Sequence, residues 1–254
     1  MRGVGVIRAG RWILDGINWE VDAGEHWVVL GPNGAGKSTL MSIAGARMFP
    51  SRGEAAVLGH ELGAVHLSEI TPAVGYVGAA EGEHIPDSER VVDVVATAVH
   101  GIRGRWRETY DRVDMERAVG LLTTWGVGGL ADRHLGSLSD GEWKRVMIAR
   151  ALMTDPEMLI LDEPAAGLDV AAREHLVADL ERMARDEHGP CTITVTHHFE
   201  EIPSTASHAI LLSAGHTIAQ GRLRDVISDA SISMAYGSAL HAVEYGGRWM
   251  VVRA

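Results

Sequence analysis

Short apolar segments separated by polar turns recur along the chain, and their spacing predicts an α/β fold. Trp27–Leu30 and Met158–Leu161 are continuously apolar, which is typical of strands buried on both faces of a parallel sheet. Thr192–Thr196 alternates and is rich in β-branched residues, so it predicts another strand. The remaining predicted strands are an antiparallel pair at Val4–Ile7 and Ile17–Val21, single strands at Ala55–Leu58 and Ala73–Val77, and a hairpin at Ala209–Leu212 and Thr217–Ala219.

A helical spacing of apolar residues replaces this pattern between Asp87 and Met153. A stretch of small and acidic residues, 78–86, precedes the region, and Asp155-Pro156 returns the chain to strand-type sequence. We therefore expect an all-helical insert within an α/β core. Outside it, the pattern predicts an amphipathic helix at Arg173–His188 and, after a weakly patterned tail, a small hairpin at Ala242–Glu244 and Trp249–Val252.

Length, charge and cysteine content limit the possible partners and cellular location of such a protein. The 254 residues suffice for one large domain with a sizeable core. The net charge of −11 disfavours a nucleic-acid partner, because affinity for duplexes comes from basic side chains that neutralise phosphates. Cys191 is the single cysteine, as expected in a reducing cytosol. No apolar run approaches the roughly 20 residues of a membrane-spanning helix, so we expect a cytoplasmic protein that reaches a membrane only through a partner.

The segment from Gly31 to Thr39 has the spacing G-x-x-x-x-G-K-[ST] between a predicted strand and a predicted helix over Thr39–Ala46. Glycines let backbone N–H groups approach a polyphosphate, and the helix N-terminus adds its unpaired donors. A glycine-rich turn with a surface lysine would not need all of these features together. The loop therefore predicts a nucleoside triphosphate site built from Gly31, Asn33, Gly34, Ala35, Gly36, Lys37, Ser38 and Thr39.

Two carboxylates follow the apolar strand Met158–Leu161 directly. Carboxylates at the tip of a buried strand are costly unless a positive group lies there, and a Mg²⁺-nucleotide supplies one. Asp162 and the Ser38 hydroxyl are the predicted metal-binding groups. Glu163 is then placed to act as general base on the attacking water. The competing interpretation is a surface Asp-Glu turn, which the presence of the phosphate loop disfavours.

Two further motifs flank these groups. Ser139 and Glu142 have the spacing of a capping box, which predicts a helix start, and a capped N-terminus is also an anion site. His197 follows the predicted strand Thr192–Thr196, where a histidine can hydrogen-bond a γ-phosphate. A metal pair of His197 and His198 with Glu200 or Glu201 is the alternative for this segment.

The four motifs in this order resemble the nucleotide-binding subunit of an ABC-type ATPase, over roughly residues 1–225. The resemblance identifies Gly31–Thr39 as Walker A, Leu159–Asp162 as Walker B and Leu138–Glu142 as the signature. It implies a P-loop NTPase core with a mixed sheet, an N-terminal antiparallel β part and an inserted helical subdomain. The implied catalytic residues are Glu163, His197 and Lys37, with Gly167–Asp169 as the D-loop. The expected parts of this single domain are a core at 1–77 and 156–225, a helical insert at 78–155 and a C-terminal extension at 226–254.

The same resemblance implies a head-to-tail homodimer that sandwiches two ATP molecules with Mg²⁺. Ser139 and Gly141 of one chain would contact the γ-phosphate held by Walker A of the other. Integral-membrane permease subunits and an upstream solute-binding protein are the expected partners, with the ATPase peripheral on the inner face of the cell membrane. The wording around Thr196–Pro203 and Gly24–Trp27 is similar to subunits for molybdate or iron-chelate uptake, so we expect import of a small anion or metal chelate.

The chain departs from the family pattern in three places. Gly78-Ala79-Ala80-Glu81 stands where the family has a glutamine that touches Mg²⁺ and relays to the membrane partner. The adenine-stacking aromatic falls near Arg8, with Trp12 close by. Asp140 and Glu142 replace glycine and glutamine in the signature, and we expect Asp140 to point away from the phosphates, because repulsion would outweigh its gain from the helix dipole.

Two other functions are compatible with parts of the pattern. One is a soluble, non-transport ABC-type ATPase that acts on a protein or nucleic acid, which the missing glutamine allows. The other is a regulatory module that binds nucleotide without hydrolysing it, which the presence of both Glu163 and His197 disfavours. We take the transport ATPase as the prediction.

Overall fold

The computed structural model describes residues 1–78, 85–101 and 110–254. Its centre is a six-stranded mixed sheet in the order β11-β10-β3-β9-β8-β7, within which only β11 runs antiparallel to its neighbour. The strands are β3 (His26–Leu30), β7 (Val74–Val77), β8 (Met158–Asp162), β9 (Cys191–Val195), β10 (His208–Ser213) and β11 (His216–Arg222). The predicted strands in this sheet, including the hairpin, are confirmed.

Both faces of the parallel strands are covered, which explains their continuous apolar sequence. In β8, Ile160 belongs to a buried cluster shared with α1 and the N-terminal strands, whereas Leu159 and Leu161 belong to a cluster shared with the helical region. A third cluster joins β3 and β10 to the C-terminal elements. The register pairs Val195 with both Val29 and Asp162, so the carboxyl ends of β3, β9 and β8 lie at one edge.

A three-stranded antiparallel sheet precedes this core, in the order β2-β1-β4. Its strands are β1 (Arg2–Arg8), β2 (Arg11–Ile17) and β4 (Arg52–Glu54), and a separate pair is formed by β5 (Ala56–Val57) and β6 (His60–Glu61). The prediction of a strand at Ile17–Val21 is wrong, since β2 ends at Ile17. A tight turn at Ala9 and Gly10, both with positive φ, brings β2 back early, and Trp19 is buried in a connecting segment instead.

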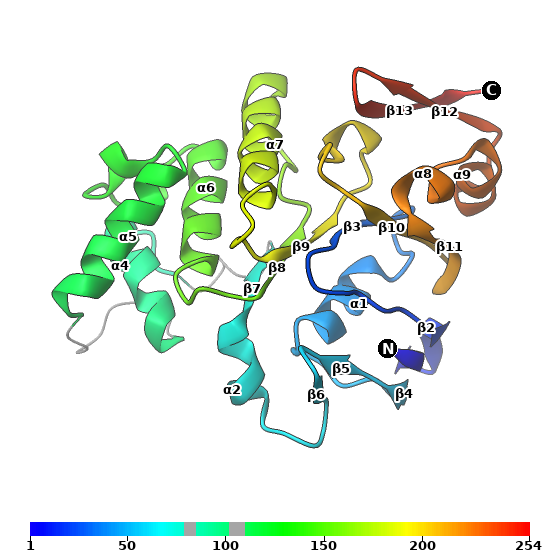
Figure 1. Ribbon diagram of the computed structural model, residues 1–254, viewed down its shortest axis with the longest axis horizontal. Helices are drawn as coiled ribbons and strands as arrows, with labels where there is room; N and C mark the ends of the chain where they lie inside the picture. Colours follow the sequence, from blue (N-terminus) through cyan, green and yellow to red (C-terminus); the bar gives the residue numbers. More distant parts are fainter. Residues whose placement is uncertain (79–84, 102–109) are drawn as a thin grey trace.

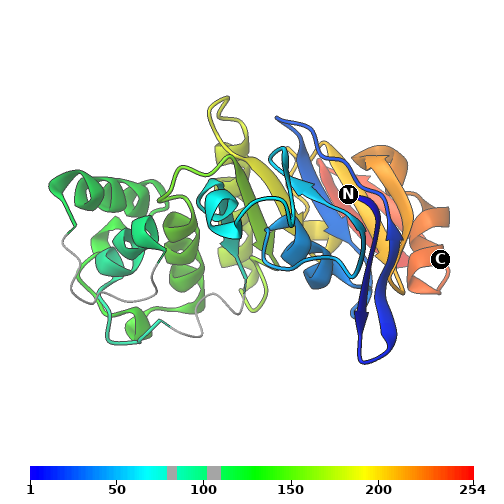
Figure 2. The ribbon, with the colours of Figure 1, turned by 90° about the horizontal axis from the view of Figure 1, so that it is seen from below.

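The helices gather mainly on one side of the sheet. Figure 1 shows α4, α5 and α6 together beyond β7, with α7 between them and the C-terminal elements, and Figure 2 shows the same cluster at the end of the molecule opposite the N-terminal strands. The helices are α1 (Lys37–Ala44), α2 (Leu67–Ile70), α4 (Val91–Ala96), α5 (Arg112–Thr124), α6 (Asp140–Ala151), α7 (Val170–Ala184), α8 (Leu223–Val226) and α9 (Asp229–Tyr236), with short 3₁₀ turns η1 (Thr71–Ala73), η2 (Thr97–His100), η3 (Gly128–Leu130), η4 (Leu135–Ser137) and η5 (Phe199–Glu201).

The helix boundaries differ from the predicted ones by a few residues. α1 starts at Lys37, two residues before the predicted start, because its N-cap is Gly36, and it ends before Gly45. α7 starts at Val170, where the Asp169 side chain accepts a hydrogen bond from the Ala172 N–H. The mixed α/β fold with an N-terminal antiparallel part and a helical insert is confirmed. The residue boundaries proposed for core, insert and extension stay predictions.

The C-terminal part is more ordered than the sequence pattern predicted. The hairpin is confirmed as β12 (Leu240–Tyr245) and β13 (Arg248–Arg253), but α8 and α9 were not expected. The N-cap of α9 is Ser228, which forms a capping box with Ser231, a pair that lacks the usual acidic residue of that motif. Among the described residues, no helix is long and apolar enough to cross a membrane.

Candidate active site

The loop after β3 requires glycine at two positions. Gly31 has φ +143° and a Cβ there would lie 2.2 Å from the Leu212 carbonyl oxygen. Gly36 has φ +100°, and a Cβ would lie 2.6 Å from Leu14 Cδ2. Both the backbone conformation and the close neighbours therefore exclude side chains. Between them, Ala35 is buried while Asn33 and Gly34 are exposed at the tip of the loop.

Lys37 lies beneath this loop, with only 6% of the residue exposed. Its Nζ donates to the carbonyl oxygens of Gly31 at 2.7 Å and Pro32 at 3.1 Å. Burial lowers the pKa of Lys37, and the nearby charges of Glu163 and Asp162 raise it, which partly offsets the effect of burial. The ammonium group thus closes the loop from inside and faces the carboxylates that follow β8.

The start of α1 is open to an anion. Gly36 as N-cap provides no side-chain acceptor, and no acidic residue lies in the first turn. The N–H groups of Lys37, Ser38 and Thr39 therefore have no intrahelical acceptor. Ser38 is exposed, and its hydroxyl lies near enough to the Asp162 carboxylate to lower the pKa of that group. The two oxygen groups predicted to bind a metal are thus neighbours.

Asp162 is the last residue of β8, and its carboxylate interacts with several neighbouring side chains. The Tyr76 hydroxyl, from β7, donates to Asp162 Oδ2 at 3.3 Å. Burial raises the pKa of Asp162 above its ordinary value, and Glu163 adds to the rise, while the hydrogen bonds from Ser38 and Tyr76 and the charge of Lys37 oppose it. The Asp162 carboxylate is therefore a partly desolvated anion that an additional positive charge would stabilise.

Glu163 and His197 form a close pair. His197 Nδ1 lies 2.9 Å from Glu163 Oε1, and each side chain is about one-third exposed, at 32% and 35%. The backbone of Glu163 has φ +51°, an uncommon conformation for a residue other than glycine. Its N–H donates to the Val195 carbonyl at 3.0 Å, so β9 holds both partners. Glu163 therefore combines an uncommon backbone conformation with a side chain directed at His197.

Ser139 is the N-cap of α6 and takes part in the predicted capping box. The Glu142 carboxylate accepts hydrogen bonds from the Ser139 N–H and hydroxyl, both at 2.8 Å, and these bonds lower the pKa of Glu142. A Cβ on Gly141 would lie 3.7 Å from Ala172 Cβ, so the turn is next to the start of α7. In the described parts of the chain, no hydrogen bond joins Ser139 or Gly141 to the loop at 31–39.

Five predicted site residues therefore meet at one edge of the sheet: Lys37, Ser38, Asp162, Glu163 and His197. Ser139 and Gly141 lie at the start of a separate helix. In the comparison with known proteins, residues 14–166 match the ABC transporter family. The chain belongs to the ABC transporter family. It is 38% identical to an ABC transporter ATP-binding protein of Bacillus subtilis (strain 168), over 99% of this chain and 95% of that protein.

Two further proteins are similar to this ABC ATPase, one in sequence and one in structure. A zinc import ATP-binding protein of Paramagnetospirillum magneticum is 34% identical, over 85% of this chain and 76% of the relative. Among solved structures, cbiO1 of Clostridium perfringens, part of an ABC transporter complex, superimposes with a TM-score of 0.78 at 26% identity, covering 92% and 91% of the two chains. ABC transporter ATP-binding proteins hydrolyse ATP coupled to transport, so this chain is a nucleotide-binding ATP hydrolase.

The departures from the family pattern are only partly visible in this ABC ATPase. Ala79, Ala80 and Glu81 lie outside the described residues. Arg8 donates to Met48 Sδ at 3.5 Å. Trp12 carries the Arg52 guanidinium over its ring at 4.8 Å, so one face of the only aromatic in β2 is already covered.

Sequence reasoning missed two polar residues of the ABC ATPase site. Tyr76 reaches Asp162 from β7, and Lys144 Nζ on α6 lies 3.4 Å from the Glu163 carbonyl oxygen. Burial lowers the pKa of Lys144, whereas Asp140, Glu163, Asp162 and Glu201 raise it. Tyr76 could have been suspected from its place at the end of a strand next to β8. Nothing in the local pattern around Lys144 indicates that it reaches back to Glu163.

The alternative metal pair at His197 and His198 gains no support. Among the residues that the structure describes, no group of three or more His, Cys, Asp or Glu side chains is placed to hold a metal ion. His198 Nδ1 lies 3.7 Å from Glu200, and its ring is tilted against that of His197 with centroids 4.1 Å apart.

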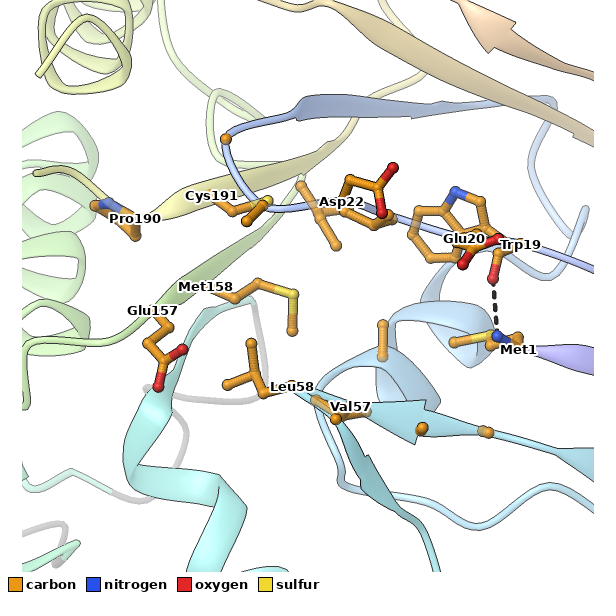
Figure 3. Close-up of a pocket in the computed structure, with 18 of the residues that line it drawn as sticks. Met1, Trp19, Glu20, Asp22, Val57, Leu58, Glu157, Met158, Pro190 and Cys191 are labelled. Atoms are coloured by element: carbon orange, nitrogen blue, oxygen red, sulfur yellow. Dashed lines mark hydrogen bonds between the residues drawn. The ribbon is translucent and has the colours of Figure 1, made fainter. Parts of the chain in front are cut away.

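A cleft of about 1190 Å³ lies elsewhere in the ABC ATPase, at the amino ends of β8 and β9 (Figure 3). Its lining includes Trp19, Leu58, Met158 and Cys191, and none of the predicted site residues. The amino ends of parallel strands are the edge opposite to the one that carries Asp162 and His197. The size of this cleft therefore does not mark the predicted site, whose residues lie at the carboxyl edge.

Proposed function

We propose that this chain is the ATP-hydrolysing subunit of an ABC importer, in which two copies clasp Mg²⁺-ATP head to tail. The observation that carries the proposal is the assembly of Lys37, Ser38, Asp162, Glu163 and His197 at one sheet edge, beside the open N-terminus of α1. Each of these groups has the chemistry that a phosphoryl-transfer site needs, because such sites act mainly by positioning and charge stabilisation.

The loop at Gly31–Thr39 binds the phosphates in this proposal. The N–H groups of the first turn of α1 have no intrahelical acceptor and can donate to phosphate oxygens, and the Lys37 ammonium supplies a full positive charge. The Ser38 hydroxyl and the Asp162 carboxylate are neighbouring hard oxygen donors, which fits Mg²⁺. When bound there, Mg²⁺ would neutralise charge on the phosphates. The raised pKa of Asp162 is consistent with a carboxylate that a cation would stabilise.

Glu163 is the proposed general base. Its carboxylate accepts the attacking water's proton, and the hydrogen bond that it accepts from His197 Nδ1 orients it. The opposite ring nitrogen, Nε2, faces the γ-phosphate and donates to it when the ring carries both protons. The one-third exposure of both side chains lets water and nucleotide reach them. The left-handed backbone at Glu163 fixes the direction of the carboxylate before substrate binds.

The signature turn is the proposed contact to the second copy. Ser139 and Gly141 are exposed or half-buried at the start of α6, so a partner's γ-phosphate can approach the N-terminus of this helix. Hydrolysis removes the group that both copies share, and the dimer then loosens. The Glu142 carboxylate is engaged with Ser139, and the charge of Asp140 interacts with Lys144 one turn later. The first contact has to open before the Ser139 hydroxyl can donate to a γ-phosphate, whereas the second supports an Asp140 carboxylate that points away from the incoming phosphate.

Coupling to a permease follows from the family. The ABC transporter ATPases to which this chain is similar include a zinc import protein, which supports import as the direction of transport. The proposed cargo is a small anion or a metal chelate, and the proposed partners are permease subunits and a solute-binding protein. The site of action is then the inner face of the cell membrane. No described feature favours a nucleic-acid partner or a non-transport role.

A matched pair of cap variants tests the sandwich. Ser139→Ala and Ser228→Ala each remove the serine of a capping box, on α6 and α9, and each should cost about 0.5–2 kcal/mol of stability. In a Glu163→Gln background, size-exclusion chromatography with ATP should show dimers for Ser228→Ala and mainly monomers for Ser139→Ala, with equal nucleotide binding by the monomers. Equal dimerisation of the two variants would remove Ser139 from the interface.

Transport itself is tested by co-purification. The tagged chain purified from the membranes of its own cells should co-isolate with a multi-helix membrane protein, the permease, and that permease in vesicles should stimulate hydrolysis. A chain that neither binds the permease nor responds to it would redirect the proposal toward the non-transport ATPase.

A further inference from the structure

The C-terminal hairpin contacts the segment that follows His197. β13 packs against η5, which begins two residues after His197. Figure 1 shows the hairpin of β12 and β13 beside the loop that leaves β9, next to α7. Nothing in the sequence pattern connected residues 226–254 with the chemistry of the site, so this contact assigns a task to a part of the chain that had none.

Arg248 makes the specific contacts of this hairpin. One guanidinium nitrogen donates to the Glu200 carbonyl oxygen in η5 at 3.1 Å, and another donates to Glu174 Oε2 in α7 at 2.9 Å. The Arg248 side chain is 26% exposed. Arg173 on α7 adds a contact of 3.6 Å to Glu200 Oε1. The fork of Arg248 therefore fastens η5 to α7 from the outside.

The segment between His197 and η5 transmits such a constraint because it is closed by its own hydrogen bonds. The Thr196 hydroxyl donates to the Glu201 carboxylate at 2.6 Å, and the His198 N–H donates to Thr196 Oγ1 at 3.0 Å. Thr196 and Glu201 are only 1% and 6% exposed. A shift of η5 therefore moves the residues on both sides of His197 as one unit.

We propose that Arg248 is a positioning residue that holds η5 against α7 and so keeps His197 aligned with Glu163. The inference rests on the proposed function of the His197–Glu163 pair. The hairpin thereby sets the turnover of the site without touching nucleotide. Because one arginine joins a C-terminal strand to the switch segment, any event that lifts the hairpin would slow hydrolysis.

The hairpin itself does not depend on Arg248. Its inward side chains, among them Trp249 and Val251, pack on the third buried cluster of the core. A second arginine, Arg224 on α8, binds Glu244 of β12 at 2.9 Å and is more exposed, at 76%. Replacing Arg224 removes a hairpin contact that does not involve η5, which makes it a matched control.

The test compares kcat, the KM for ATP and the thermal midpoint of Arg248→Gln, Arg248→Lys and Arg224→Gln. Arg248→Gln should lower kcat by about three- to tenfold, because it removes two charge-assisted hydrogen bonds, and should change KM by less than about twofold. Arg248→Lys, which retains one of the two contacts, should fall between. Arg224→Gln should match the wild type. Hydrogen exchange should accelerate in peptides covering 196–203 for Arg248→Gln only.

The comparison with His197→Ala separates the two levels of the argument. His197→Ala should lower kcat strongly, and adding Arg248→Gln to it should cause no further loss, because Arg248 acts through His197. Full turnover of His197→Ala would refute the proposed function. A strong effect of His197→Ala together with wild-type kcat for Arg248→Gln would overturn this inference alone, as would a loss in the double variant equal to the product of the single losses.

Discussion

Glu163→Gln separates the chemical step from nucleotide binding and stability. The substitution keeps the shape of the side chain, and the Gln oxygen can accept the hydrogen bond that Glu163 Oε1 forms with His197 Nδ1 at 2.9 Å. What is lost is the capacity to take a proton. Loss of one well-placed catalytic group typically costs about 10²–10³ in rate, which corresponds to roughly 2.7–4.1 kcal/mol of transition-state stabilisation.

The effect of the same change on stability is small because two electrostatic terms oppose each other. The Glu163 charge raises the pKa of Lys37, which is an attraction, and it contributes to the raised pKa of Asp162, which is a repulsion. Glu163 is also one-third exposed, so solvent screens both terms. We expect the net change in unfolding free energy to stay within about 1 kcal/mol. For a chain of this length, that shifts the thermal midpoint by about 2–4 °C.

The assay measures steady-state phosphate release at saturating ATP and Mg²⁺, thermal unfolding, and size-exclusion chromatography with ATP. Glu163→Gln should lose about 10²–10³ in kcat, keep its thermal midpoint within about 4 °C of the wild type and accumulate as an ATP-bound dimer. Glu187→Gln, an exposed Glu-to-Gln change outside the site, is the control. Unchanged turnover, or a loss of turnover explained by a lower thermal midpoint, would remove Glu163 from the mechanism.

Three further outcomes follow from the geometry of the site. Lys144→Met should lower kcat by roughly tenfold without weakening nucleotide binding, because it removes the cation beside the Glu163 carbonyl. A fall in kcat that is accompanied by a rise in the KM for ATP would contradict this prediction. Tyr76→Phe keeps the ring but removes the hydroxyl bound to Asp162, so a several-fold higher Mg²⁺ concentration should be needed for half-maximal ATP binding, which a titration with a fluorescent nucleotide would show or refute. Glu142→Gln should lower stability by about 0.5–1 kcal/mol at neutral pH. Since the pKa of Glu142 is lowered in the folded state, its contribution is complete above the ordinary value of 4.5 and disappears as pH falls through the folded-state pKa; a difference between the two unfolding curves that persists at lower pH would contradict the assignment.

Local sequence was sufficient for the elements whose causes are local. The apolar strands β3 and β8 lie where the pattern predicted them, because burial on both faces requires continuous apolar sequence. The phosphate loop was predictable because Gly31 and Gly36 occupy conformations that other residues avoid. Where the cause is not local, the predictions were wrong or absent. The predicted bounds of β2 were wrong because pairing with β1, and not the apolar residues at Ile17–Val21, decides where this strand begins and ends.

Several functional contacts were decided only by the tertiary structure, because they join residues far apart in the chain. The sequence by itself determined that a nucleotide-binding loop, a strand tipped with carboxylates and a histidine at a strand end are present. It could not determine that Tyr76 reaches Asp162, that Lys144 reaches Glu163, or that Arg248 reaches Glu200. A motif is detectable when backbone conformation or burial dictates its residues. A long polar side chain that crosses between elements obeys no such local rule, so only the packing of the elements shows its partner.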